Sequence, residues 1–177
     1  MSGSSYPFRP INPVARRRRN LKTKDLSLIT VYAALYAVLV IVFQPISFSA
    51  LQFRVAGTLR PAIAKKKTLA AGYALGTIVA NIFSPFTGPY ELLFMPVMSL
   101  IAGLAGHAIS KRFNDNYYLC GITIATIIPL SVSWMLYQLF NLPIVSTLPG
   151  LLISEQIINL LGATIFKMIE PRYRWWE

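Results

Sequence analysis

The stretch YYLCGITIATIIPLSVSWMLYQLF, residues 117–140, contains no charged side chain. A helix needs about 20 mainly apolar residues to cross the hydrocarbon core of a bilayer, and this stretch provides them. Similar runs occupy residues 26–43, 90–110 and 148–169, and residues 68–83 approach the same length with their flanks. These runs predict an all-α integral membrane protein.

The overall composition also favours a membrane domain. Of 177 residues, 55% are hydrophobic and 13% are charged, and the mean hydropathy is +0.54. The six acidic residues are too few to give a soluble domain of this size a polar surface. We expect one transmembrane domain at residues 25–171. A disordered basic cytoplasmic tail at 1–24 is expected before it, and a cytoplasmic interfacial tail at 172–177 after it.

The formal net charge of +11 is concentrated in short basic clusters between the apolar runs. These clusters occupy residues 16–24, 65–67, 111–112 and 167–174, and the linkers between them are nearly free of Lys and Arg. Cytoplasmic loops of membrane proteins hold an excess of Lys and Arg. The alternation predicts six transmembrane helices with both termini in the cytoplasm, in the cell (cytoplasmic) membrane. It assigns the positive charge to the lipid bilayer and not to nucleic acid.

Residues 51–64 form the weakest of the six predicted spans, because they are few and include Arg54, Arg60 and Pro61. The alternation of charge requires this segment to cross, as a short second helix. Arg60 is then expected to face protein or a water-filled cavity, because an arginine in contact with lipid would be costly. Arg54 either contacts a ligand or anchors the outer interface by extending its charged end to water.

Two carboxylates stand inside the predicted spans. Glu155 is expected a turn or two below the outer surface, where an ionisable group is a candidate for substrate binding. The alternative is an ion pair with Arg60 or Arg54 that ties helices together. Glu91 opens the helix at 90–110, where it either binds a ligand or faces water and favours the helix dipole.

Several polar and aromatic side chains are predicted at the outer ends of the spans. They are Asn81, Trp134, Tyr137, Gln138 and Asn141. Together they would line a polar, aromatic pocket. Alternatively, the amides bond across helices and the aromatic rings lie in the interfacial belt.

Ala33 and Ala37 form an Ala-x-x-x-Ala stripe, which serves either packing within the chain or docking of another membrane protein. His107 and Cys120 are expected to be packing residues. The sequence contains no catalytic triad, metal-ligand cluster or phosphate-binding loop, so we expect neither an enzyme nor a cofactor. Energy for any transport must then come from a gradient or a partner.

A set of motifs resembles a known family. Pro45 precedes Gln52-Phe53-Arg54-Val55, residues 76–85 read GTIVANIFSP, Glu91 opens the next helix, and Ser154 precedes Glu155. Over roughly residues 28–165 the chain resembles the queuosine-precursor transporter (QueT-like) family, the substrate-binding S components of energy-coupling factor (ECF) transporters. It departs from the family at residues 56–59, where Ala-Gly-Thr-Leu replaces the usual Ser-Glu-Ala-Leu. Glu91 replaces the more usual Asp, and Ser154 replaces Gly.

The resemblance implies an S-component-like bundle that takes up a 7-deazaguanine precursor. Glu155 would accept paired N–H bonds from a guanine-like edge while aromatic rings stack on the ligand. Arg54 and residues 44–52 would close the site, and Asn81 and Glu91 would contact polar groups. The implied partners are an ECF coupling transmembrane subunit, met by the Ala33 and Ala37 stripe, and paired cytoplasmic ATPase subunits. Another small vitamin-like heterocycle is an alternative cargo, and a membrane scaffold with structural buried charges is an alternative function.

Overall fold

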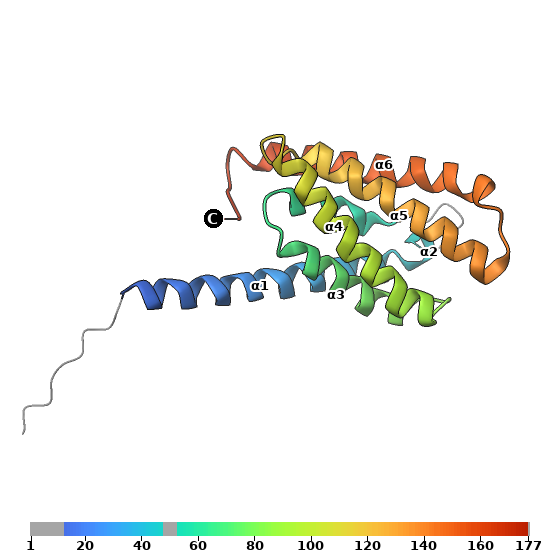
Figure 1. Cartoon of the computed structure of the whole chain (residues 1–177), viewed down its shortest axis with the longest axis horizontal. Helices are drawn as coiled ribbons and strands as arrows, with labels where there is room; N and C mark the ends of the chain where they lie inside the picture. The colour runs from blue at the N-terminus through green and yellow to red at the C-terminus, as the bar shows by residue number, and fades with distance from the viewer. Residues whose placement is uncertain (1–12, 48–52, 177) are drawn as a thin grey trace, which may run out of the picture.

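The chain forms an all-helical bundle in a computed structural model that describes residues 13–47 and 53–176 (Figure 1). Within these residues there is no strand. In chain order the elements are α1 (Pro13–Val42), α2 (Gln44–Ser47), η1 (Val55–Ala64), α3 (Leu69–Ile82), η2 (Tyr90–Phe94), α4 (Met95–Lys111), α5 (Tyr117–Phe140) and α6 (Ile144–Ile169).

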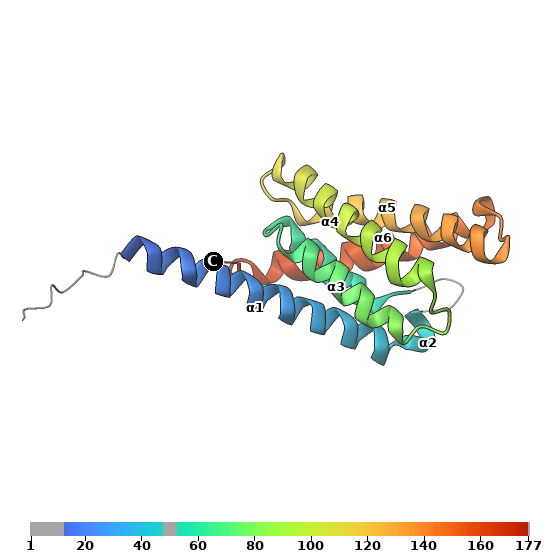
Figure 2. The same ribbon diagram turned by 60° about the horizontal axis from the view of Figure 1, so that its bottom comes forward.

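The long helices pack in the order α1, α3, α4, α5 and α6, each against the next. The segment η1 contacts all five of them, so it occupies the middle of the bundle (Figures 1 and 2). Its burial agrees with this position, because Arg60, Ile63 and Ala64 have no exposed surface. Small residues, among them Ala56 and Gly57, allow the surrounding helices to approach it closely.

The segment η1 is a 3₁₀ helix, which is longer than an α-helix of the same number of residues. Pro61 lies inside it and has no backbone N–H to donate to the preceding turn of an α-helix. Its 10 residues extend about 20 Å at the 3₁₀ rise of about 2.0 Å per residue. The short helix predicted at 51–64 therefore exists from Val55 onward, while residues 51 and 52 lie outside the described part of the chain. Arg60 faces protein, as predicted.

The first helix is longer than the sequence predicted. α1 begins at Pro13, so the structure has the segment 13–24, where the sequence predicts a disordered tail, as part of this helix. Proline is favoured in the first helical turn, and Arg and Lys are good helix formers, which accounts for the extension. Figure 1 shows the N-terminal half of α1 projecting beyond the bundle. Residues 1–12 lie outside the described part.

Glycines on α3 bring α1 and α3 into close contact. A Cβ added to Gly76 would lie 2.9 Å from the carbonyl oxygen of Ala33, and one added to Gly72 would lie 2.9 Å from that of Ile29. Ala37 belongs to the buried core and is 3% exposed. The stripe of Ala33 and Ala37 thus takes part in packing within the chain, and docking of a partner on it stays a prediction.

Four helical stretches are long and apolar enough to cross a membrane: Thr23–Val42, Tyr90–Lys111, Tyr117–Phe140 and Ile144–Ile169. α3 is a shorter apolar helix of 14 residues, which extends about 21 Å at about 1.5 Å per residue. Large apolar side chains on the outside of the bundle, such as Val145 at 86% and Leu93 at 71% exposure, suit a lipid environment. The chain is therefore a multi-pass, all-helical membrane protein.

Candidate functional site

An ion pair joins η1 to α6 in the middle of the bundle. Nη1 of Arg60 donates to Oε2 of Glu155, and the two residues are 0% and 4% exposed. Charges removed from water need several partners to offset their desolvation. Nη2 of Arg60 donates to the Tyr36 hydroxyl at 3.2 Å, and Nδ2 of Asn159 donates to Glu155 Oε2 at 3.1 Å.

Two tyrosine rings complete this group. The guanidinium carbon of Arg60 lies 5.2 Å from the ring centroid of Tyr73 and 5.9 Å from that of Tyr36. Both distances are within the range of cation–π attraction. The rings contact each other edge to face, with centroids 5.0 Å apart. We call Tyr36, Arg60, Tyr73, Glu155 and Asn159 the central cluster.

The central cluster has no net charge and retains hydrogen-bonding capacity. Within the described residues, Nε of Arg60 and Oδ1 of Asn159 are buried without a hydrogen-bond partner. The cluster therefore offers a donor, acceptors and aromatic faces at one place. These groups can form hydrogen bonds and ring contacts with a ligand.

The ion pair that the sequence offered as the alternative for Glu155 is present. Glu155 also lies deeper than predicted, because α6 begins at Ile144 and Pro149 is accommodated inside the helix. At about 1.5 Å per residue, Glu155 is about 16 Å along the axis from the first residue of α6. The pairing leaves the predicted substrate role of Glu155 open to test.

A second polar group lies at η2, the segment that leads into α4. Met95 N–H bonds to the carbonyl of Tyr90, the five-residue spacing of a π-helix. The next donor in that series would be Pro96, which has no N–H, so the carbonyl of Glu91 needs another partner. Nδ2 of Asn81 supplies it at 2.8 Å. This bond ties the outer end of α3 to η2.

The same pair leaves two buried acceptors unsatisfied. Oδ1 of Asn81 and Oε2 of Glu91 have no hydrogen-bond partner in the described part of the chain, and the residues are 0% and 2% exposed. One of the two sequence-based predictions for Glu91 was that it faces water, but its side chain is buried. We call Asn81 and Glu91 the outer cluster. It can accept hydrogen bonds from a donor-rich group.

The two clusters lie at different depths. Tyr73 of the central cluster and Asn81 of the outer cluster are both on α3, separated by about 12 Å at about 1.5 Å per residue. A hydrogen bond of 3.2 Å between Thr77 and Ser99 lies between these two levels. The predicted site residues thus form two groups instead of one layer.

Arg54 is buried at 3% exposure just before η1. Because its side chain is enclosed by protein, it does not extend to water at the interface. The ligand role predicted for Arg54 stays a prediction.

Two predicted site residues lie elsewhere. Gln138 and Trp134 are exposed, Trp134 by 40%, and Gln138 lies in the last turn of α5, where residues 137–140 are all exposed. The ring of Trp134 packs on Phe94, with centroids 4.9 Å apart. The structure brings neither Gln138 nor Trp134 into the two clusters.

Sequence reasoning missed three members of the central cluster. Asn159 follows Glu155 by one helical turn, and this spacing could have indicated it. Tyr36 and Tyr73 carry no comparable signal, because tyrosine in a membrane span is most often assigned to the interface. His107 is satisfied as predicted, with Nδ1 3.0 Å from the carbonyl oxygen of Ile63, and Cys120 is buried in the core. No group of three metal-ligating side chains occurs among the described residues.

A model of the QueT transporter family matches residues 26–171. The chain belongs to the QueT transporter family. This confirms the resemblance and assigns the chain a role in membrane transport. No curated protein and no solved structure matches it. The QueT-family range contains every residue of the central and outer clusters.

Proposed function

We propose that the chain is the substrate-binding S component of an ATP-driven ECF importer and that it binds a 7-deazaguanine queuosine precursor. Membership of the QueT transporter family supports a transport role. The observation that carries the site is the buried carboxylate of Glu155, held by Arg60 and Asn159 beside two tyrosine rings. Intramembrane ionisable groups of this kind are characteristic of substrate pathways.

Recognition would use the carboxylate and the rings together. Glu155 accepts paired N–H bonds from the guanine-like edge, and such charge-assisted bonds are stronger than neutral ones. Arg60 then releases Glu155 and donates to the ligand's carbonyl oxygen, so neither charge is left without a partner. The rings of Tyr36 and Tyr73 cover the ligand's apolar faces. Because Arg60 and Glu155 neutralise each other, this end of the site favours a ligand edge without net charge.

The outer cluster would bind the other end of the same ligand. Tyr73 and Asn81 are about 12 Å apart along α3, so a ligand that reaches both clusters must be elongated. The unsatisfied oxygens of Asn81 and Glu91 accept N–H groups from it. Arg54 contributes from the beginning of η1.

The transport assembly follows from the same proposal. Six crossings with both termini in the cytoplasm place the basic loops beside the ATPase subunits. The coupling transmembrane subunit would meet α1, whose Ala34, Val31 and Val38 are exposed next to the packed Ala37. The chain itself supplies binding, and its partners supply the energy.

Binding of labelled 7-deazaguanine precursors and a panel of vitamins to the purified full chain in detergent tests the proposal. We expect saturable binding of a deazaguanine that Glu155→Gln weakens by at least about tenfold, the loss of about one charge-assisted hydrogen bond. Asp25→Asn is the matched control, because it removes a half-exposed carboxylate paired with Lys66 at 2.6 Å. Binding of a vitamin alone would redirect the proposal to another heterocycle.

A second variant separates folding from binding. Glu155→Gln leaves Arg60 buried without its counter-charge, which is destabilising in itself. Arg60→Gln with Glu155→Gln removes both charges, so this double variant is expected to fold and still fail to bind. If every compound fails to bind the folded wild-type protein, the import proposal is wrong.

The ion pair favours one rival function. A membrane scaffold would use Arg60 and Glu155 only to tie η1 to α6, and their mutual pairing fits that role. A scaffold has no tight small ligand. The same binding experiment therefore decides between the two functions.

A further inference from the structure

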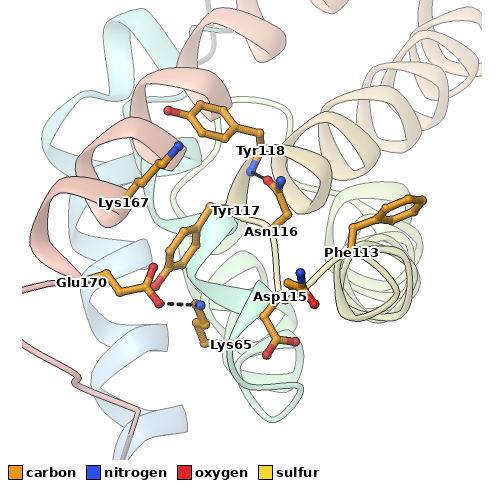
Figure 3. Close-up of a pocket in the computed structure, with 9 residues that line it drawn as sticks. Lys65, Phe113, Asp115, Asn116, Tyr117, Tyr118, Lys167 and Glu170 are labelled. Atoms are coloured by element: carbon orange, nitrogen blue, oxygen red, sulfur yellow. Dashed lines mark hydrogen bonds and ion pairs between the residues drawn. The ribbon is translucent and has the colours of Figure 1, made fainter.

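A separate pocket of about 330 Å³ lies at the end of the bundle opposite the outer cluster. It is formed where η1 ends, α5 begins and α6 ends (Figure 3). The residues that matter here are Lys65, Phe113, Asp115, Tyr117, Lys167 and Glu170. None of them belongs to the proposed substrate site.

Two lysines and two carboxylates line the pocket, so its formal charge is zero. Lys65 pairs with Glu170 at 2.6 Å and lies 4.9 Å from the ring centroid of Tyr117. In the described part of the chain, neither Lys167 nor Asp115 has an oppositely charged partner within 4.0 Å. Figure 3 shows these two residues on opposite sides of the pocket. The pocket therefore presents a separated positive and negative charge.

Tyr117 provides an independent sign of an occupant. Its side chain is buried, with 3% exposure, yet its hydroxyl has no hydrogen-bond partner among the described residues. In Figure 3 the hydroxyl points toward the pair of Lys65 and Glu170 inside the pocket. A buried hydroxyl without a partner costs free energy, and a polar occupant of the pocket removes that cost.

The depth of the pocket matches lipid headgroups. Tyr117 is the first residue of the apolar stretch Tyr117–Phe140, and Lys167 lies in the last turn of the stretch Ile144–Ile169. The ends of membrane-spanning helices lie at the level of the headgroups. Phe113 and Met168 are 59% and 72% exposed nearby, which gives acyl chains an apolar surface.

We propose that this pocket binds a phospholipid whose headgroup carries both a phosphate and a primary ammonium. The phosphate accepts hydrogen bonds from Lys167 and from the Tyr117 hydroxyl, and the ammonium donates to Asp115. A headgroup with a net negative charge and no ammonium cannot pair with the Asp115 carboxylate, so it is expected to bind less tightly. A choline headgroup has no N–H to donate to the carboxylate.

Lipid binding to the purified full chain, measured by native mass spectrometry with defined added lipids, tests the proposal. Phosphatidylethanolamine is expected to bind about tenfold more tightly than phosphatidylcholine or phosphatidylglycerol, a difference of about 1.4 kcal/mol. Equal binding of the three lipids would overturn the proposal.

Charge variants identify the contacts. Asp115→Asn is expected to abolish the preference for phosphatidylethanolamine and to strengthen binding of phosphatidylglycerol. Asparagine suits this position because Asp115 has a positive φ of 52°, which asparagine tolerates. Lys167→Gln is expected to weaken the binding of all three lipids by about tenfold, the contribution of one charged contact. Lys111→Gln is the matched control, an exposed lysine outside the pocket lining, and is expected to change nothing.

A soluble headgroup distinguishes a lipid from a free phosphate compound. Glycerophosphoethanolamine has the same charges without acyl chains and is expected to compete only at concentrations far above those of the lipid. If it competes as well as the lipid does, the occupant is a soluble molecule and the lipid proposal is wrong. This outcome is independent of 7-deazaguanine binding, so the two proposals can fail separately.

Discussion

Gly162 is a residue at which α6 and η1 approach closely. A Cβ at this position would lie 2.1 Å from the carbonyl oxygen of Thr58 and 2.7 Å from its carbonyl carbon. Both neighbours are backbone atoms and cannot rotate away. The contact that positions Arg60 beside Glu155 therefore requires glycine at 162.

Gly162→Ala is expected to destabilise the protein by about 1–3 kcal/mol or more, because α6 and η1 must separate to admit the methyl group. Thermal unfolding in detergent measures the loss. Gly88→Ala is the control, since a Cβ there would have its nearest neighbour at 3.7 Å. Equal midpoints for the two variants would contradict the close contact.

For individual residues, the sequence predicted the environment of the charged side chains better than it predicted which uncharged side chains surround them. Arg60 was expected to face protein because lipid excludes it, and a bond to Glu155 was one of two stated possibilities. The tyrosines of the central cluster could not be predicted, because their role depends on how α1 and α3 turn toward η1. That rotation is set by packing of small residues such as Gly76, and no single residue reports it.

At the scale of elements, η2 depends on a contact from another helix. Pro96 deprives the Glu91 carbonyl of a backbone donor, and Asn81 replaces that donor from α3. The position and the geometry of the turn are thereby fixed by residues from two elements.

Asn81→Leu is expected to destabilise the protein by about 1–3 kcal/mol, because it leaves a buried carbonyl without a partner. Pro96→Ala supplies a new N–H, so adding it to Asn81→Leu is expected to recover part of the loss. Unfolding of the two single variants and the double variant gives the coupling between them. Strictly additive effects would show that Asn81 and Pro96 act independently.

The sequence predicted α3 and α5 nearly at their observed bounds, because each is an apolar run with breakers at its ends. The helix predicted at 90–110 corresponds to η2 and α4 together. It placed the beginning of α6 at 148 instead of Ile144, because the proline at 149 suggested a boundary. Pro149 is the sixth residue of α6, so it removes the one backbone bond that its N–H would make to the carbonyl of Val145, and the helix continues through it. The sequence shows Pro61, which disfavours an α-helix in η1, but it does not show that this segment contacts all five long helices.

At the scale of the whole molecule, the direction of the chain through the membrane can be measured. The proposed six crossings with both termini inside would put Pro85 and Ser146 on the outer side and Lys66 and Asn114 on the inner side. Pro85, Asn114 and Ser146 are exposed, Lys66 is partly exposed, and native Cys120 is fully buried. Single cysteines at these positions therefore report topology with little background.

A membrane-impermeant maleimide added to intact cells is expected to label Pro85→Cys and Ser146→Cys but not Lys66→Cys or Asn114→Cys. Permeabilised cells are expected to label all four, which controls for accessibility. Labelling of Lys66→Cys from outside would mean that η1 does not cross.

The place of η1 in the bundle has a consequence for how the protein is made. Arg60 is synthesised 95 residues before its partner Glu155. When the ribosome delivers η1 to the insertion machinery, the helix that neutralises its charge does not yet exist. On the proposed topology, we expect residues 55–64 to insert fully only after α6 has been synthesised. α6 would then complete the insertion of η1.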